Sequence, residues 1–120
     1  VLAALDDATP IVPAPLSPVD QAALDELNHL TEEVTNDMNE YRFYLAAEKL
    51  YHYVWHVFAD KIIEEAKSRL PEGRWLLYTV FKRVLQLLHP FTPFITEDLW
   101  SLLPRTEPAT LLIKTPWPIL

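Results

Sequence analysis

A stripe of histidines and carboxylates is the first place in this sequence where metal chemistry could occur. The stripe repeats every four residues, which would place its members along one face of a helix: Glu48, His52, His56, Asp60 and Glu64. Imidazole and carboxylate groups at that spacing can bind zinc and other transition metals. However, Tyr53 follows His52 where a His-Glu-x-x-His motif needs Glu, and the Glu-x-x-His motif of di-iron bundles occurs once, at residues 26–29. We therefore expect a solvated polar stripe that binds no metal.

Two stripes that contain basic residues are better suited to RNA. The first lies in the middle of the chain, and the second places a Trp beside two cations on one face of the next helix. An exposed Trp can stack on an unpaired base, although the same side chain could instead cover a terminal segment or a domain outside this sequence. The candidate RNA-binding residues are Arg42, Lys49, Trp75, Lys82 and Arg83. We expect RNA on the side that they form.

No catalytic site is visible in the sequence. The chain of 120 residues contains no Cys and a single Gly, which excludes a thiolate nucleophile, a Gly-x-Ser-x-Gly elbow and a Gly-rich phosphate loop. Nothing distinguishes one pair among the 17 acidic residues as a general acid and base. We therefore expect no catalytic residue and no bound cofactor in this chain.

The Pro residues divide the chain into about four helices. Ser17 and Pro18 are typical of an N-cap and a first helical residue, and the segment from there to Pro71 contains no Pro or Gly. That segment is too long for one ordinary helix, so it must break. The expected helices begin at residue 18 and, after a break within 36–44, span about 45–68, 74–89 and 92–103, followed by an extended, strand-like stretch at 109–115.

Apolar residues recur at helical spacing in the first three of these segments and should form the core. They are Leu27, Leu30, Val34 and Met38, then Phe43, Ala47, Leu50, Tyr51, Val54, Val57, Phe58 and Ile62, then Leu77, Val80, Phe81, Val84 and Leu88. Pro90 and Pro93 should fix a tight corner before the last helix. We expect the corner to be locked by Phe91, Phe94, Ile95, Leu99 and Trp100, with His89 hydrogen-bonded to a carbonyl.

Composition indicates one folded, all-α domain. Half of the residues are apolar and 22% are charged, which excludes a disordered chain. The predicted architecture is a helical bundle with extended N- and C-terminal arms: residues 1–16 as the remnant of a preceding helix and a Pro-rich linker, 17–104 as the bundle, and 105–120 as the C-terminal arm. The first residue is Val rather than Met, which suggests an excerpt from a longer chain.

The charge of the chain is concentrated at one end. The net charge is −7, and residues 1–40 hold nine acidic residues and no Lys or Arg. Phosphates should avoid that end. The sequence has no run long and apolar enough to cross a membrane, and it has no Cys, which suits a reducing compartment. We expect a cytoplasmic protein that has neither a membrane nor DNA as a partner.

The last predicted helix carries the most specific sequence motif. His89–Trp100 (HPFTPFITEDLW) closely resembles a motif near the end of the anticodon-binding helical domain of valyl-tRNA synthetases. Residues 41–43 (YRF), 55–60 (Trp-x-x-Phe-x-Asp) and 116–118 (PWP) are similar to other segments of that domain in order and spacing, so the resemblance covers nearly the whole chain. The leucyl and isoleucyl relatives usually carry Ala-Pro in place of His89-Pro90. The sequence departs from the family pattern at Tyr44 and at Lys61-Ile62.

The resemblance implies a binding module cut from an enzyme. A module of this family would bind the anticodon stem-loop of a valine tRNA, while the catalytic and other domains of the same synthetase would use ATP to charge the tRNA. The His-Ile-Gly-His and Lys-Met-Ser-Lys-Ser signatures of those catalytic domains are absent here. The alternatives are the corresponding leucyl or isoleucyl domain, a helical protein-interaction module and, more remotely, a metal-dependent hydrolase.

Overall fold

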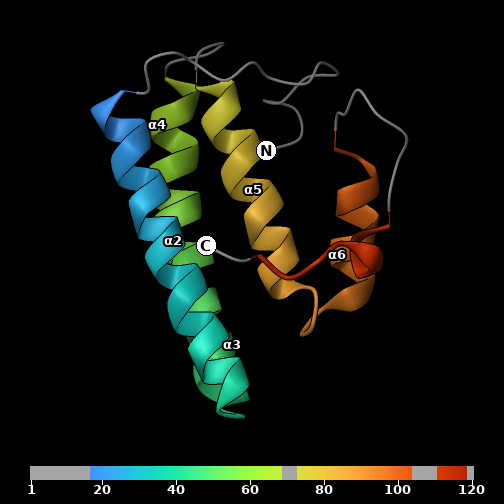
Figure 1. Ribbon diagram of the computed structural model, residues 1–120. Coiled ribbons are helices and arrows are strands. Elements are labelled where there is room, and N and C mark those ends of the chain that lie inside the picture. The colour runs from blue at the N-terminus through green and yellow to red at the C-terminus, as the bar shows by residue number, and fades with distance from the viewer. Residues whose placement is uncertain (1–16, 69–72, 104–110, 119–120) are drawn as a thin grey trace.

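The chain folds into packed helices, with no β-strand in the parts that the structure describes. A computed structural model describes residues 17–68, 73–103 and 111–118. Its elements are α2 (Pro18–Asn39), α3 (Phe43–His52), the π-helix η1 (Tyr53–Ile63), α4 (Glu64–Lys67), α5 (Arg74–Leu88), α6 (Pro93–Ser101) and the 3₁₀ helix η2 (Leu112–Lys114). Since α3, η1 and α4 follow one another directly, they form one rod beside α2 and α5 (Figure 1). The predicted all-α bundle of about four helices is confirmed.

The two predicted terminal arms have different outcomes. Residues 1–16 lie outside the described residues, so the interpretation of that segment as a helix remnant and linker stays a prediction. The strand-like stretch expected at 109–115 is wrong where the structure describes it, because Leu112–Lys114 forms a turn of 3₁₀ helix. No helix of the described ranges combines the length and the apolarity needed to cross a bilayer.

Helix α2 begins as the sequence predicts. The Ser17 Oγ accepts a hydrogen bond from the backbone N–H of Asp20 at 3.1 Å, and Pro18 occupies the first turn, where no intrahelical donor is needed. Three of the four residues predicted to face the core are buried and the fourth is partly buried: Leu27, Leu30, Val34 and Met38. The amphipathic pattern therefore set the orientation of α2 correctly.

The predicted break after α2 is a short turn. Tyr41 adopts a φ of 60°, a left-handed conformation that is rare for an aromatic residue, and the Arg42 N–H then donates to the Asp37 carbonyl at 2.7 Å. Helix α3 starts at Phe43, two residues earlier than expected. The left-handed residue turns the chain back, so that α3 runs beside α2 in the opposite direction (Figure 1).

The long rod buries a narrower face than the sequence predicts. Its buried side follows Ala46, Leu50 and Tyr53, so Phe43 and Tyr51 lie at the margin and are exposed, contrary to the predicted core. Between residues 53 and 63 the rod is a π-helix, in which i→i+5 hydrogen bonds replace the α-helical pattern. The assumed rotation of 100° per residue does not hold in that part of the rod.

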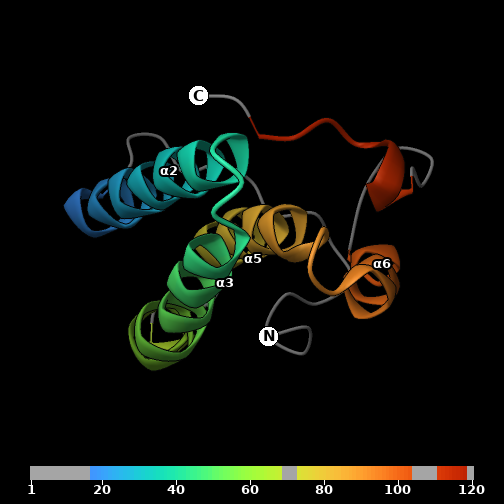
Figure 2. The same cartoon turned by 90° about the horizontal axis from the view of Figure 1, so that it is seen from below.

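Helix α5 is the central element of the bundle. It packs between the pair formed by α2 and α3 on one side and α6 on the other (Figure 2). Its buried residues surround much of the helix: Leu76, Leu77, Val80, Phe81, Val84, Leu85 and Leu87. The predicted inward residue Leu88 is only partly buried. The Phe81 ring stacks on Phe58 of η1 with ring centroids 5.9 Å apart.

The single glycine of the chain lies where α4 and α5 approach each other. Gly73 is buried next to Ala66, and a Cβ added to Gly73 would lie 2.4 Å from the Ala66 carbonyl oxygen. The φ of Gly73 is −73°, which any residue can adopt. The lack of a side chain, rather than backbone freedom, is what this position requires.

The corner between α5 and α6 is only partly the predicted cluster. Trp100 is 5% exposed and Leu103 is also buried, whereas Phe94 is 91% exposed and Ile95 is 59% exposed. The prediction that Phe94 and Ile95 lock the corner is therefore wrong. Helix α6 presents Thr96 and Trp100, which are four residues apart, to α5, and this orientation turns Phe94 and Ile95 to the outside.

Polar contacts at this corner also differ from expectation. The His89 Nδ1 lies 2.8 Å from the Thr96 hydroxyl, and no carbonyl partner of His89 occurs among the described residues. Thr92 precedes Pro93 at the start of α6 as predicted, but its hydroxyl donates to the Leu88 carbonyl instead of capping α6. The predicted helix start is confirmed, and Thr92 is its N-cap residue, although its side chain makes no capping hydrogen bond.

The described C-terminal residues pack back across the bundle. The Glu97 carboxylate of α6 accepts hydrogen bonds from the backbone N–H groups of Leu112 and Ile113 at 2.7 and 3.1 Å. Further along, the Trp117 indole N–H donates to the Thr35 hydroxyl of α2 at 2.8 Å. This segment thus connects α6 with α2, which lie on opposite sides of α5 (Figure 2).

Candidate functional site

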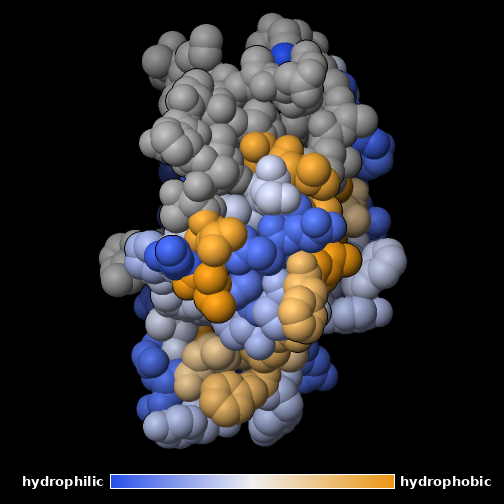
Figure 3. Space-filling model, turned by 90° about the vertical axis from the view of Figure 1, so that its right-hand side faces the viewer, coloured by the Kyte–Doolittle hydropathy of each residue, from blue (hydrophilic) through white to orange (hydrophobic). Residues whose placement is uncertain are grey.

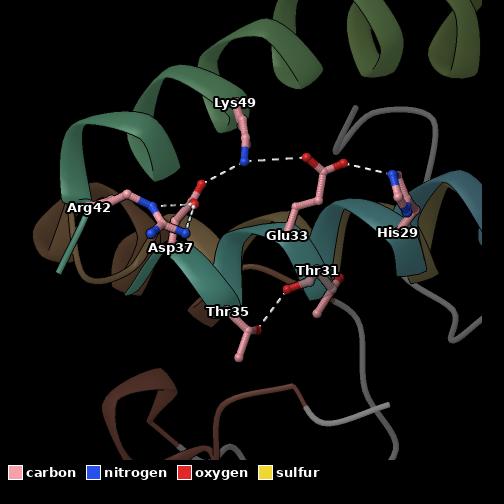
Figure 4. A network of polar contacts seen from close by, with 7 residues as sticks. All are labelled: His29, Thr31, Glu33, Thr35, Asp37, Arg42 and Lys49. Atoms are coloured by element: carbon pink, nitrogen blue, oxygen red, sulfur yellow. Dashed lines mark hydrogen bonds and ion pairs between the residues drawn. The ribbon is translucent and has the colours of Figure 1, made fainter. Parts of the chain in front are cut away.

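Arg42 and Lys49 are held by one carboxylate between α2 and α3. The Asp37 Oδ2 lies 2.7 Å from the Lys49 ammonium, and its Oδ1 accepts a hydrogen bond from the Arg42 guanidinium at 3.3 Å (Figure 4). Lys49 also pairs with Glu33 at 3.3 Å, and Glu33 pairs with His29. The charges alternate in sign along the interface from Arg42 through Asp37 and Lys49 to Glu33.

Asp37 is the anchor of this network. Its side chain is only 4% exposed, whereas the Arg42 side chain is 46% exposed and the Lys49 side chain is 36% exposed. The Lys49 ammonium, and to a lesser extent the Arg42 guanidinium, lower the pKa of the Asp37 carboxyl against the opposing effect of burial. The carboxyl groups of Asp37 and Glu33 in turn raise the pKa of Lys49. The charge of Lys49 is therefore largely neutralised by the carboxylates of the same domain.

The three candidates on α5 face different neighbours. The Lys82 ammonium lies 5.6 Å from the centre of the Trp100 ring and 5.7 Å from that of Tyr78. The Arg83 guanidinium instead donates to Asn28 and Thr31 of α2, and its burial lowers its pKa. Trp75 is partly buried against the core, which fits the packing alternative for this residue.

The five candidates therefore do not form the single surface that the sequence suggested. Lys49 faces the α2–α3 interface, Arg83 the α2–α5 interface and Lys82 the α5–α6 interface. The helix-wheel argument fails on α5 because this central helix has no broad outer face. The assignment of Arg42, Lys49, Trp75, Lys82 and Arg83 to RNA binding stays a prediction.

Exposed aromatic side chains lie on the turn before α3, on α3 itself and at the start of η1. We call this surface the aromatic face, and its members are between 48% and 80% exposed: Tyr41, Phe43, Tyr44, Tyr51 and Trp55. Tyr44 and Tyr51 are seven residues apart within α3, which places them on one side of that helix, and the Trp55 ring lies next to that of Tyr51. Tyr41 and Phe43 meet edge to face at the turn, with ring centroids 6.1 Å apart.

An apolar groove lies next to the aromatic face. It has a volume of about 240 Å³ and runs between the rod and the end of α5, lined by Ala47, Tyr51, Val54, Trp55, Leu88 and Phe91. The rings of Tyr51 and Trp55 are 6.2 Å apart and tilted by 58°. No residue that lines this groove is charged. Flat rings at the rim of an apolar groove can accept planar groups such as nucleobases by stacking.

The sequence contains a signal for this surface. The wide apolar arc of this segment predicts that Phe43 and Tyr51 lie in the core, and Trp55 belongs to the motif at residues 55–60. The signal is that this segment contains more aromatic residues than one buried face can hold. The actual boundary of that face required the positions of α2 and α5.

A second exposed apolar surface lies on α6 and η2. Its members are all more than half exposed: Phe94, Ile95, Leu102, Leu111 and Ile113. Figure 3 shows apolar side chains in several groups on this side of the molecule, separated by polar ones. We call it the α6–η2 patch. It is mainly aliphatic, so it suits contact with another protein surface better than stacking on bases.

The histidine stripe does not assemble a metal site in the described part of the chain. There, no group of three or more His, Asp or Glu side chains is arranged to hold a metal ion. The rings of His52 and His56 lie 4.8 Å apart, centre to centre, and both side chains are exposed.

Comparison with known proteins gives consistent matches. The family model described as the anticodon-binding domain of tRNA ligase matches residues 20–119. A valine–tRNA ligase of Thermotoga maritima is 42% identical over 98% of this chain, and one of Carboxydothermus hydrogenoformans is 41% identical over the same share. A valine–tRNA ligase of Neisseria meningitidis is 42% identical over 78% of the chain. The chain spans 14% of the length of the first two ligases and 11% of the third.

Proposed function

Because this chain belongs to the family of anticodon-binding domains of tRNA ligases, we propose that it binds the anticodon stem-loop of a valine tRNA. The chain acts as one domain of a longer valine–tRNA ligase in the cytoplasm. This chain matches only about a seventh of the length of such ligases, so we place the ATP-dependent charging of the tRNA in the other domains of the ligase. The named relatives are valine–tRNA ligases, which supports valine rather than leucine or isoleucine as the amino acid of the tRNA.

The aromatic face is the observation that carries this proposal. An anticodon loop is single-stranded, so its bases can turn outward and stack on aromatic side chains. Tyr51 and Trp55 border the apolar groove, and both are more than half exposed. Each ring that stacks on a base contributes about 1–3 kcal/mol to binding. Two such contacts are enough to orient a loop on the α3–η1 rod.

Charge has a smaller role in this mode of binding. Arg42 lies directly between Tyr41 and Phe43 of the aromatic face, and about half of its side chain is exposed. It can contact a phosphate while its other side stays paired with Asp37. Lys49 is less available, since two carboxylates already surround its ammonium group. This arrangement suits a domain whose net charge is negative.

The α6–η2 patch supports contact with another domain of the same ligase. Five exposed apolar residues on two adjacent elements would otherwise remain in water. The Glu97 contacts fix η2 next to α6, so that the patch is formed by a defined pair of elements.

Affinity measurements on the full-length ligase test the proposed RNA surface. Tyr51→Ala and Trp55→Ala should each weaken tRNA binding by about 1–3 kcal/mol, which is roughly 5- to 150-fold. Val19→Ala is the control, because this half-exposed apolar side chain lies at the start of α2, outside both the aromatic face and the α6–η2 patch. Equal affinity of all three variants and the wild type would contradict the proposed surface.

The salt dependence of binding separates the aromatic face from the candidates on α5. Arg42→Gln should lower the slope of log affinity against log salt by about 0.7 if Arg42 contacts one phosphate of the loop. The pair Lys82→Ala and Arg83→Ala should leave the slope unchanged, since both side chains are engaged within the fold. A lower slope for that pair alone would place the RNA on α5.

A further inference from the structure

A cleft between α2 and the α3–η1 rod has a lining that the proposed RNA contact does not use. Its volume is about 460 Å³, and its lining combines carboxylates with an apolar floor: Glu26, His29, Leu30, Glu33, Leu45, Glu48, Lys49, His52, Tyr53 and Val57. The groove of the aromatic face shares no lining residue with it. The rod therefore carries two distinct recesses.

The rim of this cleft is negatively charged. Three carboxylates line it, and Glu26 and Glu48 are exposed. Lys49 is the single permanent cation in the lining, and it is paired with Glu33 and with Asp37 behind it. Glu26 and Glu48 make no ion pair among the described residues. Their charges can attract a cation that enters the cleft.

The floor of the cleft is apolar and includes an unused hydroxyl group. Leu30, Tyr53 and Val57 are all at most 9% exposed. The Tyr53 hydroxyl is buried and has no hydrogen-bond partner among the described residues. A buried polar group without a partner is unfavourable, and a polar ligand group that reached it would remove that cost.

We propose that this cleft binds an amphipathic cation, that is, a guanidinium or ammonium group carried on an aliphatic stem. The stem lies on Leu30 and Val57, and the charged group lies at the rim, where Glu26 and Glu48 attract it. A phosphate or another anion is disfavoured by the same carboxylates. The ligand can be a free alkyl cation or the side chain of an Arg or Lys from another part of the ligase.

Titration with a series of alkylguanidinium ions tests the proposal. The 120-residue chain is titrated with guanidinium, ethylguanidinium and butylguanidinium at low salt, and binding is followed by NMR shifts of backbone amides. The affinity should rise with stem length by up to about fourfold for each methylene that is buried on the floor. An affinity that is independent of stem length would show attraction to surface charge alone and would overturn the proposal.

Substitutions at the rim locate the site. Glu26→Gln and Glu48→Gln should each lower the affinity for butylguanidinium by about twofold to fivefold, as for a partly exposed ion pair. Glu32→Gln is the matched control, because it removes the same charge from an exposed position of α2 outside the cleft. If Glu32→Gln has the same effect as the other two substitutions, the proposal is wrong.

The full-length ligase distinguishes the two sources of the cation, and this comparison rests on the proposed function. Butylguanidinium binding that depends on Glu48 and persists in the full-length ligase indicates a free cation. Loss of that binding in the ligase, when the 120-residue chain retains it, indicates that a basic side chain of the ligase fills the cleft. Both outcomes require that the 120-residue chain binds butylguanidinium in a way that depends on Glu48. If the chain shows no such binding, the proposal is overturned, whichever surface binds RNA.

Discussion

Replacing Gly73 with Ala should destabilise the fold, although this substitution often stabilises proteins. At a position whose φ suits any residue, Gly→Ala usually adds about 0.4–1 kcal/mol, because it restricts the unfolded chain. At Gly73 the added Cβ would lie 2.4 Å from the carbonyl oxygen of Ala66 and 2.8 Å from its Cα. Both are backbone atoms, so no side chain can rotate away. The junction of α4 and α5 must move instead.

The expected loss follows from these opposing effects. Overpacking of a close contact costs about 1–3 kcal/mol, and the entropic gain offsets up to about 1 kcal/mol. The net loss should be about 1–2 kcal/mol, which corresponds to a fall in Tm of several degrees for a domain of this size. Urea unfolding followed by circular dichroism measures it. Gly73→Ser carries the same Cβ and should lose at least as much, and a stability of Gly73→Ala equal to or above wild type would refute the close approach of the two helices.

Four further substitutions test other parts of the fold. Trp100→Ala should lower the free energy of unfolding by about 3–5 kcal/mol, because it truncates a buried aromatic side chain. Ile95 is exposed, so Ile95→Ala should change the free energy of unfolding by less than about 0.5 kcal/mol. Similar losses for the two variants would contradict the orientation of α6. Burial raises the pKa of the Tyr53 hydroxyl, with a smaller contribution from Glu26. In the unfolded chain this pKa is about 10. The stability that the neutral hydroxyl provides is therefore present below about pH 10 and is lost as the pH rises further. Tyr53→Phe should therefore lose less stability above pH 10 than wild type, and identical pH profiles of the two proteins would contradict the burial of this hydroxyl. At pH 7 the variant should be about 1 kcal/mol more stable, because it removes a hydroxyl without a partner among the described residues. Glu97→Gln should accelerate hydrogen exchange at the amides of residues 112 and 113, which the carboxylate now holds, and unchanged exchange would show that the segment is held by other contacts.

The helices and most of the core could be predicted because they depend on local patterns. Ser17 and Pro18 mark the start of α2, and Leu27, Leu30 and Val34 bury as their spacing indicates. The positions of helix ends depend on Pro and on capping groups, which the sequence shows directly. The family was identified for the same reason, because the motif at residues 89–100 is a contiguous segment.

The contacts between helices could not be predicted in the same way. Phe94 belongs to the motif and was expected in the core, yet the rotation of α6 about Thr96 and Trp100 places it in solvent. Arg83 and Lys82 are neighbours in sequence but turn to α2 and α6. A periodic pattern shows which residues share a face, but it does not show how many other helices surround that face.

Photo-crosslinking of tRNA to the full-length ligase tests the central claim most directly. A photoreactive nucleotide is placed in the anticodon loop of a valine tRNA, and the crosslinked residues are identified by mass spectrometry. If the aromatic face binds the loop, the adducts should fall within residues 41–55 and include Tyr51 or Trp55. Adducts concentrated on the acidic surface of α2, for example at Asp25 or Glu32, or on α6 would contradict it.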